Sequence, residues 1–135
     1  MHIREFTMED YDKVVALWRA AGLTVGFSEA REGIRQKLER DPQLFLVAEE
    51  GDEIVGAVMG TYDGRRGYFY RLGVLPSRQG RGIGSALVEE VERRLAAMGC
   101  KKINVLVVED NERAKALYRK LGYSLAPVDV MIKEL

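Results

Sequence analysis

A glycine-rich turn at residues 78–85 has the composition of an anion-binding site. It reads RQGRGIGS and follows the short apolar run LGVL at residues 72–75. Glycines at alternate positions let consecutive backbone N–H groups converge on one point, because no Cβ stands in the way. An amphipathic helix is expected from about residue 82, and its first turn would add unpaired N–H groups and the positive end of the helix dipole. The turn therefore predicts a cradle for a phosphate group, and Arg78 and Arg81 are expected to attract it.

Two other phosphate-binding patterns fit this turn poorly. A P-loop ends in a Lys-Ser or Lys-Thr pair, and no such pair follows Gly80 or Gly82, which excludes it. The dinucleotide pattern G-x-G-x-x-G would place its third glycine at position 85, where the sequence has Ser85. It also expects an acidic residue about twenty positions later, where residues 100–104 contain none. The dinucleotide site is therefore disfavoured.

A second pattern, N-x-x-A-x-x-L-Y-x-x-L-G-Y, spans residues 111–123. Its apolar positions follow the i, i+3, i+4, i+7 spacing of a helix that packs on one face, and Gly122 is placed to end that helix. Helical periodicity does not explain why Asn111 opens the segment or why Tyr118 lies two turns later on the same side. Asp110 would cap the helix as well as Asn111 would, so the choice of cap stays open.

The two motifs together closely resemble those of the GNAT acetyltransferase superfamily, and the overall pattern is similar to its small bacterial YpeA-type branch. In that superfamily a Q/R-x-x-G-x-G/A turn holds the pyrophosphate of acetyl-CoA, and Gln79-x-x-Gly82-x-Gly84 matches it. The resemblance implies acetyl-CoA as cosubstrate and an amine as acceptor. By the same resemblance Tyr118 is the catalytic residue, with its hydroxyl near the thioester sulfur. The implied contacts with acetyl-CoA are Leu72, Gly73, Val74, Gln79, Gly80, Arg81, Gly82, Ile83, Gly84, Ser85 and Asn111.

The chemistry that this resemblance implies is direct transfer of the acetyl group to a neutral amine. Backbone N–H groups near residues 72–74 are expected to pair with the pantetheine amides and to polarise the thioester carbonyl. Tyr118 is expected to give the departing thiolate a proton, with the unperturbed pKa of about 10. Residues 68–72 contain no carboxylate, so the general base stays open between a water chain, a distant acid and Tyr70. Glu109 and Asp110 lie near the carboxyl end of the strand expected at 103–108, and they are more simply interpreted as solvated loop and cap residues.

The acceptor is expected between the loop after the first helix and the turn at Asp63. Phe27, Tyr70 and Arg71 are the candidates for substrate binding, with Trp18 and Tyr62 as further wall residues. A charged residue on a strand beside the cleft suits an acceptor carboxylate, which singles out Arg71. An outward-facing Arg71 without a ligand is the equally simple alternative.

Composition sets the outer limits of the prediction. The chain has 135 residues with 21 basic and 21 acidic side chains, a length that suits one domain. The resemblance implies that residues 1–135 form a single N-acetyltransferase domain. Zero net charge gives no global field to gather nucleic acid or an anionic membrane. A lone cysteine excludes an internal disulfide, and the absence of an apolar leader favours a cytoplasmic protein, monomeric or homodimeric.

The order of expected elements gives the fold. A right-handed crossover from strand 68–74 through helix 82–98 would make the apolar run at 103–108 a parallel neighbour, buried on both faces. With the GNAT resemblance we expect an α/β (α+β) fold. It would have a mixed, mostly antiparallel sheet of six to seven strands flanked by four helices, with a parallel strand pair splayed at the acetyl-CoA cleft.

Two other classes of function are compatible with parts of the pattern. A non-catalytic regulatory module that binds acyl-CoA would keep the cradle and would not need the general base that strand 68–72 lacks. An acetyltransferase toxin directed at tRNA would need a basic surface, which zero net charge does not provide.

Overall fold

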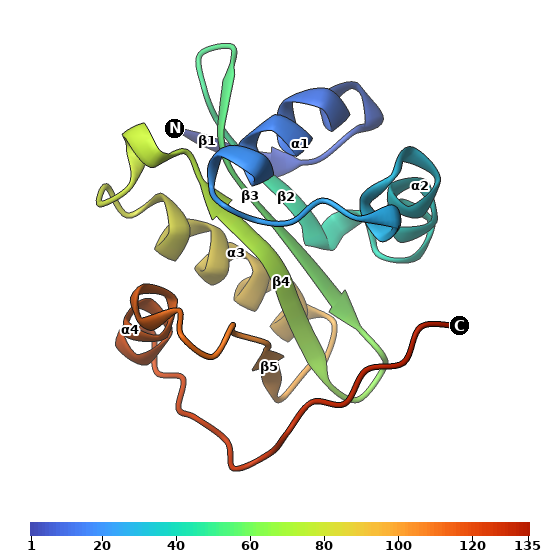
Figure 1. The fold of residues 1–135 in the computed structure, drawn as a ribbon, viewed down its shortest axis with the longest axis vertical. Coiled ribbons are helices and arrows are strands. Elements are labelled where there is room, and N and C mark those ends of the chain that lie inside the picture. The colour runs from blue at the N-terminus through green and yellow to red at the C-terminus, as the bar shows by residue number, and fades with distance from the viewer.

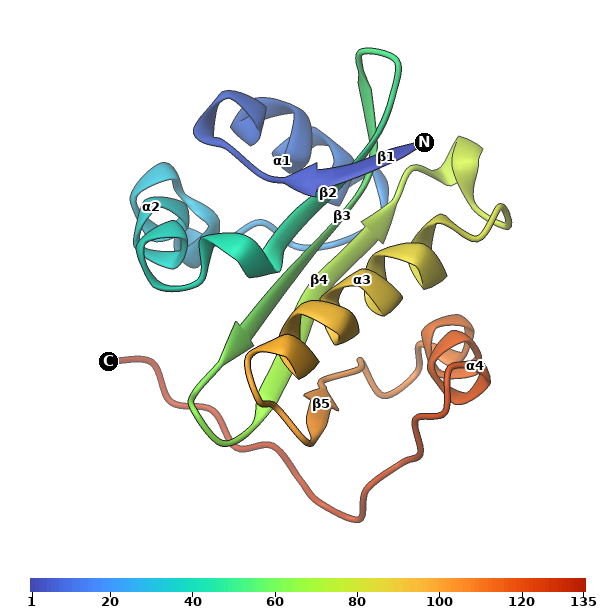
Figure 2. The same ribbon diagram turned by 180° about the vertical axis from the view of Figure 1, so that it is seen from behind.

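The computed structural model describes all 135 residues, and the sheet at its centre has five strands in the order of the chain (Figures 1 and 2). The strands and α-helices are β1 (His2–Glu5), α1 (Tyr11–Ala20), α2 (Arg31–Arg40), β2 (Phe45–Glu50), β3 (Glu53–Tyr62), β4 (Gly67–Val74), α3 (Ile83–Ala97), β5 (Ile103–Val105) and α4 (Glu112–Lys120). None of these helices is long and apolar enough to cross a membrane.

The strand pairing changes once in the sheet, from antiparallel to parallel, between β4 and β5. Strands β1 to β4 pair antiparallel, and α3 carries the chain back so that β5 runs parallel to β4. The parallel pairing joins Gly67–Phe69 to Ile103–Val105 only. Beyond Phe69, therefore, β4 has no neighbour on this side and the two strands part, as the sequence predicted.

The two faces of the sheet bury separate cores. Figure 2 shows α3 in front of the sheet and α4 to its side, and on this face Leu87, Val91 and Leu95 pack against Phe69. The opposite face is covered by α1 and α2, which bring Trp18 and Ile34 against Phe45. A fully buried Leu or Val contributes about 1.5–3 kcal/mol relative to an exposed one, so both faces are held firmly.

The expected number of strands was wrong, since the sheet has five and not six to seven. No strand follows α4: residues 124–135 form no backbone hydrogen bond with the rest of the chain. Pro127 has no N–H to donate, and no neighbouring strand pairs with the apolar side chains beyond it. Several of these side chains are therefore exposed, Ile132 and Met131 almost completely.

The strand expected at 103–108 is also shorter than predicted. It ends at Val105 and is half-buried, while Leu106 and Val108 are exposed. The prediction read an unbroken apolar run as burial on both faces. In the structure β5 is an edge strand, so nothing covers its outer residues.

A bulge in β4 determines which side chains face which side of the sheet. Tyr70 pairs with Met59 and Gly73 with Ala57, so Arg71 and Leu72 together oppose the single residue Val58. Arg71 adopts φ 58°, and it is the only non-glycine residue in the chain with a positive φ. The extra residue places Tyr70 and Arg71 both on the α1 side, whereas Leu72 packs on the α3 side.

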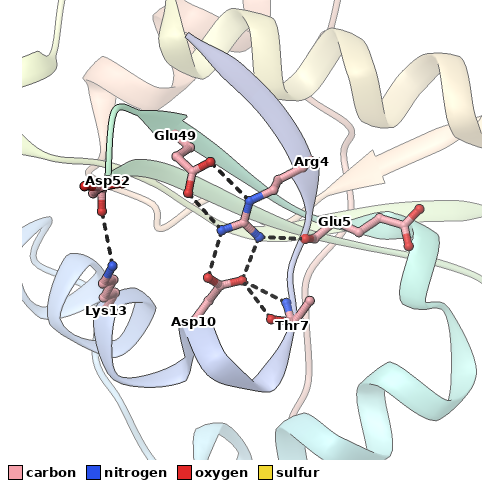
Figure 3. Close-up of polar contacts among 7 residues, drawn as sticks. All are labelled: Arg4, Glu5, Thr7, Asp10, Lys13, Glu49 and Asp52. Atoms are coloured by element: carbon pink, nitrogen blue, oxygen red, sulfur yellow. Dashed lines mark hydrogen bonds and ion pairs between the residues drawn. The ribbon is translucent and has the colours of Figure 1, made fainter.

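Arg4 on β1 connects this strand to the turn before α1 and to β2 (Figure 3). Its Nη1 and Nη2 donate to the two carboxylate oxygens of Asp10 at 2.8 and 2.9 Å. Its Nε and Nη2 donate to Glu49 on β2 at 3.4 and 3.1 Å. Asp10 also accepts from the backbone N–H of Thr7 at 2.9 Å, which closes the turn before α1. The hydrogen bonds from Arg4 lower the pKa of the buried Asp10.

Replacing Arg4 by Met should lower the free energy of unfolding by about 1–3 kcal/mol at pH 7, because Asp10 then keeps a buried charge without its partner. Asp10 has a lowered pKa in the folded state, so its pairing stabilises the fold above the unfolded pKa of about 3.9 and is lost as the pH falls through the folded value. The difference between wild type and variant in urea denaturation should therefore shrink below about pH 4.

Lys13→Met is the matched control for this network. The Lys13 ammonium donates only to the exposed backbone oxygen of Asp52 at 3.1 Å. Its loss should change the unfolding free energy by no more than about 0.5 kcal/mol. Equal effects of Arg4→Met and Lys13→Met would show that the Arg4 network does not stabilise the fold.

Candidate active site

A cleft of about 640 Å³ opens where β4 and β5 part. Its walls come from the end of α1, the second half of β4, the glycine-rich turn with the start of α3, and one side of α4. The lining residues are Ala21, Leu23, Leu72, Gly73, Val74, Arg78, Gln79, Gly80, Gly82, Ile83, Gly84, Ser85, Asn111, Arg113, Ala114, Leu117, Tyr118 and Lys120.

The turn presents unpaired backbone donors to this cleft. Gly82 is the N-cap of α3 with φ 82°, and the first backbone bond of the helix runs from the Ala86 N–H to the Gly82 carbonyl at 3.0 Å. The N–H groups of residues 83–85 have no backbone acceptor, and these residues line the cleft. Gln79 ties the turn to the end of β4, because its Nε2 donates to the Val74 carbonyl at 3.2 Å. This is the geometry of an anion site at a helix N-terminus.

The structure brings together almost all of the residues predicted to contact acetyl-CoA. Ten of the eleven line the cleft, and Tyr118 lines the same cleft. Arg81 is exposed and does not line it, so its contact with the ligand stays a prediction. The sequence reading missed lining residues from the loop after α1 and from α4, among them Leu23, Arg113 and Lys120. Positions 113 and 120 are unspecified positions inside the 111–123 motif, and only the packing of α4 shows that they border the cleft.

Asn111 is the N-cap of α4 and lines the cleft as well. Its Oδ1 accepts a hydrogen bond from the Ala114 N–H at 3.1 Å. Asp110 makes no such bond, so the choice between the two caps falls on Asn111. The cap fixes the start of α4, and Tyr118 two turns later is thereby set inside the cleft.

Tyr118 stands at the inner end of the cleft with 8% of its surface exposed. Its ring packs edge-on against Phe69 and Tyr123, with ring centroids 5.5 and 6.0 Å away. Its hydroxyl makes no hydrogen bond with the protein. The expected pKa of about 10 was wrong, because burial raises the pKa of Tyr118 to about 12. Tyr118 also lines a second cavity of about 330 Å³ between β5, α4 and the residues after α4.

The charges along the cleft all have one sign. Arg78, Arg113 and Lys120 line it, and no Asp or Glu does. Arg78 is partly neutralised, since its Nη2 donates to Glu53 at 2.8 Å and its Nε lies 3.6 Å from Glu50. Arg113 and Lys120 form no ion pair. The cleft is therefore electropositive although the chain as a whole has no net charge.

Affinity for acetyl-CoA should therefore fall as salt concentration rises. Replacing Arg113 by Gln should weaken binding by about threefold, the scale of one exposed charge, because this residue has no competing acid. Arg81→Gln should have a smaller effect, since Arg81 does not line the cleft. Calorimetric titration of wild type and variants with acetyl-CoA, from low to high ionic strength, measures the salt dependence and the effect of each substitution. A flat salt dependence, or an equal loss in the two variants, would show that the lining cations do not attract the ligand.

The candidate general bases lie outside the cleft. Glu109 and Asp110 are exposed, and neither lines it. Tyr70 packs with the α1-side core, where burial and the neighbouring Tyr68 and Asp41 raise its pKa. Its hydroxyl is therefore harder to ionise than that of a free tyrosine, and its role as the base stays a prediction.

The three candidates for acceptor binding also lie outside the cleft lining. Phe27 is 79% exposed in the segment between α1 and α2. Arg71 is not an outward-facing strand residue, because its guanidinium stacks on the Trp18 ring at 4.7 Å and faces Glu29 at 3.7 Å. Contacts of Phe27, Tyr70 and Arg71 with an acceptor stay predictions.

Known proteins are similar to this chain in sequence and in fold. Residues 5–123 match the family model described as the acetyltransferase (GNAT) family. An acetyltransferase of Pectobacterium atrosepticum is 44% identical over 135 residues, which covers 100% of this chain and 96% of that protein.

Two solved structures superpose well on the fold. The PaiA N-acetyltransferase of Thermoplasma acidophilum in complex with coenzyme A has a TM-score of 0.84 at 19% identity, covering 95% of this chain and 92% of that one. Chaetomium thermophilum Naa20, in complex with a bisubstrate analogue, has a TM-score of 0.80 at 25% identity, covering 92% and 71%.

A mixed sheet that opens over a basic, glycine-rich turn thus has the architecture of an acetyltransferase. The chain belongs to the GNAT acetyltransferase family. Membership confirms the family, the enzyme class and the cosubstrate predicted from the sequence: an N-acetyltransferase that uses acetyl-CoA.

Proposed function

We propose that residues 1–135 form one domain, monomeric or homodimeric, that moves the acetyl group of acetyl-CoA directly to a primary amine of a small molecule or a protein. One observation carries this proposal: the unpaired N–H groups of residues 83–85 and the Tyr118 side chain line one continuous cleft that contains no carboxylate. An anion site and a proton donor at two ends of one channel suit a ligand with a diphosphate at one end and a thioester at the other.

The cleft offers separate places for the parts of acetyl-CoA. The diphosphate belongs at the turn, where Gly82 and Gly84 leave the backbone accessible and Arg113 adds charge. The pantetheine arm belongs along residues 72–74 of β4, which have no β5 neighbour to occupy their backbone groups. The structures of PaiA with coenzyme A and of Naa20 with a bisubstrate analogue support coenzyme A as a ligand of this fold.

Acetyl transfer then needs one bond to form and one to break. The neutral amine nitrogen attacks the thioester carbon, the C–N bond forms, and the C–S bond breaks to leave a thiolate. Tyr118 gives its proton to the thiolate, and the proton lost by the amine leaves to water, because no carboxylate lines the cleft; a proton from water then restores the Tyr118 hydroxyl. Holding both reactants in one cleft supplies much of the rate enhancement by proximity.

Two measurements test the proposal. Acetyl-CoA at a hundredfold excess over Kd should stabilise the fold by about 2.7 kcal/mol, visible as a rise in Tm. The enzyme should also release the thiol of CoA when given a panel of primary amines and none when given their N-acetylated forms. Binding of acetyl-CoA without thiol release from any amine would favour the non-catalytic acyl-CoA-binding module instead.

A further inference from the structure

Arg71 combines an unusual backbone conformation with an unusual side-chain position. It adopts φ 58°, a region that costs a residue other than Gly about 1–2 kcal/mol. The Trp18 Nε1 donates to its carbonyl oxygen at 3.1 Å, which locks the bulge. The bulge turns the Arg71 side chain to the α1 face, one residue away from Leu72 in the wall of the cleft.

The guanidinium of Arg71 is largely enclosed, with 19% of its side chain exposed. One face stacks on the Trp18 ring. Its Nη1 lies 3.7 Å from Oε1 of Glu29, which is itself held by the Gly26 N–H at 2.9 Å and by the Ser28 hydroxyl. Glu29 stays ionised there: burial opposes ionisation, but the hydrogen bonds from Ser28 and Gly26 and the charge of Arg71 lower its pKa.

Two nitrogen atoms of this guanidinium have no hydrogen-bond acceptor in the protein. Nε and Nη2 of Arg71 are the only buried side-chain nitrogen or oxygen atoms in the chain that lack a hydrogen-bond partner. The two atoms lie on the same edge of the planar group. That edge binds a carboxylate through two parallel hydrogen bonds, and leaving such charged donors unpaired is costly.

Arg4 shows in the same protein what a guanidinium with both edges satisfied looks like (Figure 3). Asp10 takes the edge formed by Nη1 and Nη2, and Glu49 takes the edge formed by Nε and Nη2. Arg71 has one carboxylate, Glu29, on its Nη1 side, and nothing from the protein corresponds to Glu49. One further carboxylate would complete the same pattern.

We propose that Arg71 binds a carboxylate of the acceptor, so that the acceptors of this enzyme are amines that also carry a carboxylate, such as amino acids and peptides. The inference rests on the proposed function, since it names the acceptor class of that same site. Glu29 narrows the class of acceptor further. It already neutralises the charge of Arg71, so the site suits a singly charged carboxylate better than a doubly charged phosphate.

The position of Arg71 suits the acceptor rather than acetyl-CoA. The phosphates of the cosubstrate have the basic turn on the α3 face, where Arg71 does not reach. The guanidinium lies on the α1 face beside the bulge, so an amine held there by its carboxylate approaches the thioester from the side opposite to CoA. Nε and Nη2 are shielded from solvent. The acceptor therefore enters when the segment between α1 and α2, which carries Glu29, moves away from Arg71.

Side-chain NMR of the wild-type enzyme with CoA bound tests the site without turnover. The probes are N-acetylated amino acids, each compared with its carboxamide, and phenyl phosphate. The Arg71 Nε–H signal should move downfield with the acids and stay in place with the carboxamides and with phenyl phosphate. The Arg4 Nε–H signal is the internal control and should not move with any probe, because its acceptor is Glu49. If the chemical shift of the Arg71 Nε–H does not change with the acids, or changes equally with their carboxamides, the proposal is wrong.

Turnover gives the second, separate readout. Free amino acids and dipeptides should release the thiol of CoA with kcat/KM at least about 100-fold higher than their carboxamides. Arg71→Lys keeps the charge but loses the two-pronged edge, so it should raise KM for these acids while leaving acetyl-CoA affinity unchanged. Glu29→Gln should lower KM for the same acids, because it removes a like charge, an effect that a purely structural ion pair would not produce.

The outcomes separate this inference from the function on which it rests. An NMR response to acids together with no thiol release from any amine keeps the carboxylate site and refutes the transfer. Thiol release with acids and carboxamides alike, unchanged in Arg71→Lys, keeps the transfer and refutes the carboxylate site.

Discussion

Tyr118→Phe should slow acetyl transfer by about 10²–10⁴, the usual loss when one general acid is removed, and leave acetyl-CoA binding unchanged. The hydroxyl makes no hydrogen bond within the protein, so its removal breaks no structural contact. The ring packs against Phe69 and Tyr123, and Phe keeps that packing. The fold should therefore survive while the proton donor is lost.

The pH dependence follows from the burial of this tyrosine. Burial raises the pKa of Tyr118 to about 12, and the group acts while protonated. Its own ionisation should therefore not limit the rate anywhere in the neutral and mildly alkaline range. The rate should be measured under single-turnover conditions, where chemistry is visible even if product release limits kcat.

Tyr123→Phe is the matched control for Tyr118→Phe. It removes a hydroxyl from the same aromatic group, but that hydroxyl donates to Glu92 at 2.7 Å instead of lining the cleft. We expect it to cost about 1 kcal/mol of stability and to leave the transfer step unchanged. If Tyr118→Phe transfers acetyl at the wild-type rate with chemistry limiting, Tyr118 is a packing residue, and water or another group protonates the sulfur.

Gly82→Val should abolish the rise in Tm that acetyl-CoA causes. A side chain at Gly82 meets no protein atom within 4 Å, so the fold itself leaves room for it. With φ 82°, however, Val strains the turn by about 1–2 kcal/mol and places its branched side chain among the N–H groups meant for the diphosphate. Losing two hydrogen bonds to a charged group weakens binding by at least about 100-fold.

Two further glycine variants separate strain from obstruction. Gly51→Val imposes a similar strain at φ 60° in the β2–β3 turn, outside the cleft, and should lower Tm without reducing the shift on adding acetyl-CoA. At Gly84 an added Cβ would meet Leu117 at an ordinary 3.5 Å, so Gly84→Ala should be tolerated and Gly84→Val should not. An undiminished shift in both Gly82→Val and Gly84→Val would refute the anion site.

Local motifs carried most of the prediction of the cleft. The turn at 79–85 and helix α4 with its cap Asn111 are set by glycine conformation, capping and helical spacing, which depend on residues close in the sequence. Two such segments, matched to one family, were enough to place ten of eleven expected contacts in one cleft. The same reasoning put Arg81 there as well, although the turn directs it to solvent.

What sequence reasoning missed depends on register and on contacts between distant elements. The bulge at Arg71 arises because β4 has one residue more than β3 between two fixed pairs, and no local pattern encodes that count. The edge position of β5 likewise depends on whether a later segment pairs with it. The pairing of Arg71 with Glu29 crosses more than forty positions of sequence, and either residue alone reads as an ordinary surface charge.

Trp18 gives the bulge an optical reporter. It is the only tryptophan of the chain, its indole N–H is bonded to the Arg71 carbonyl, and its ring lies against the guanidinium. The wavelength of indole emission shifts with the electric field across the ring. A carboxylate that binds Arg71 should therefore shift the fluorescence emission maximum of the unlabelled protein. Selective excitation of tryptophan would then follow acceptor arrival in real time in a stopped-flow instrument, and the order in which the two substrates bind becomes directly measurable.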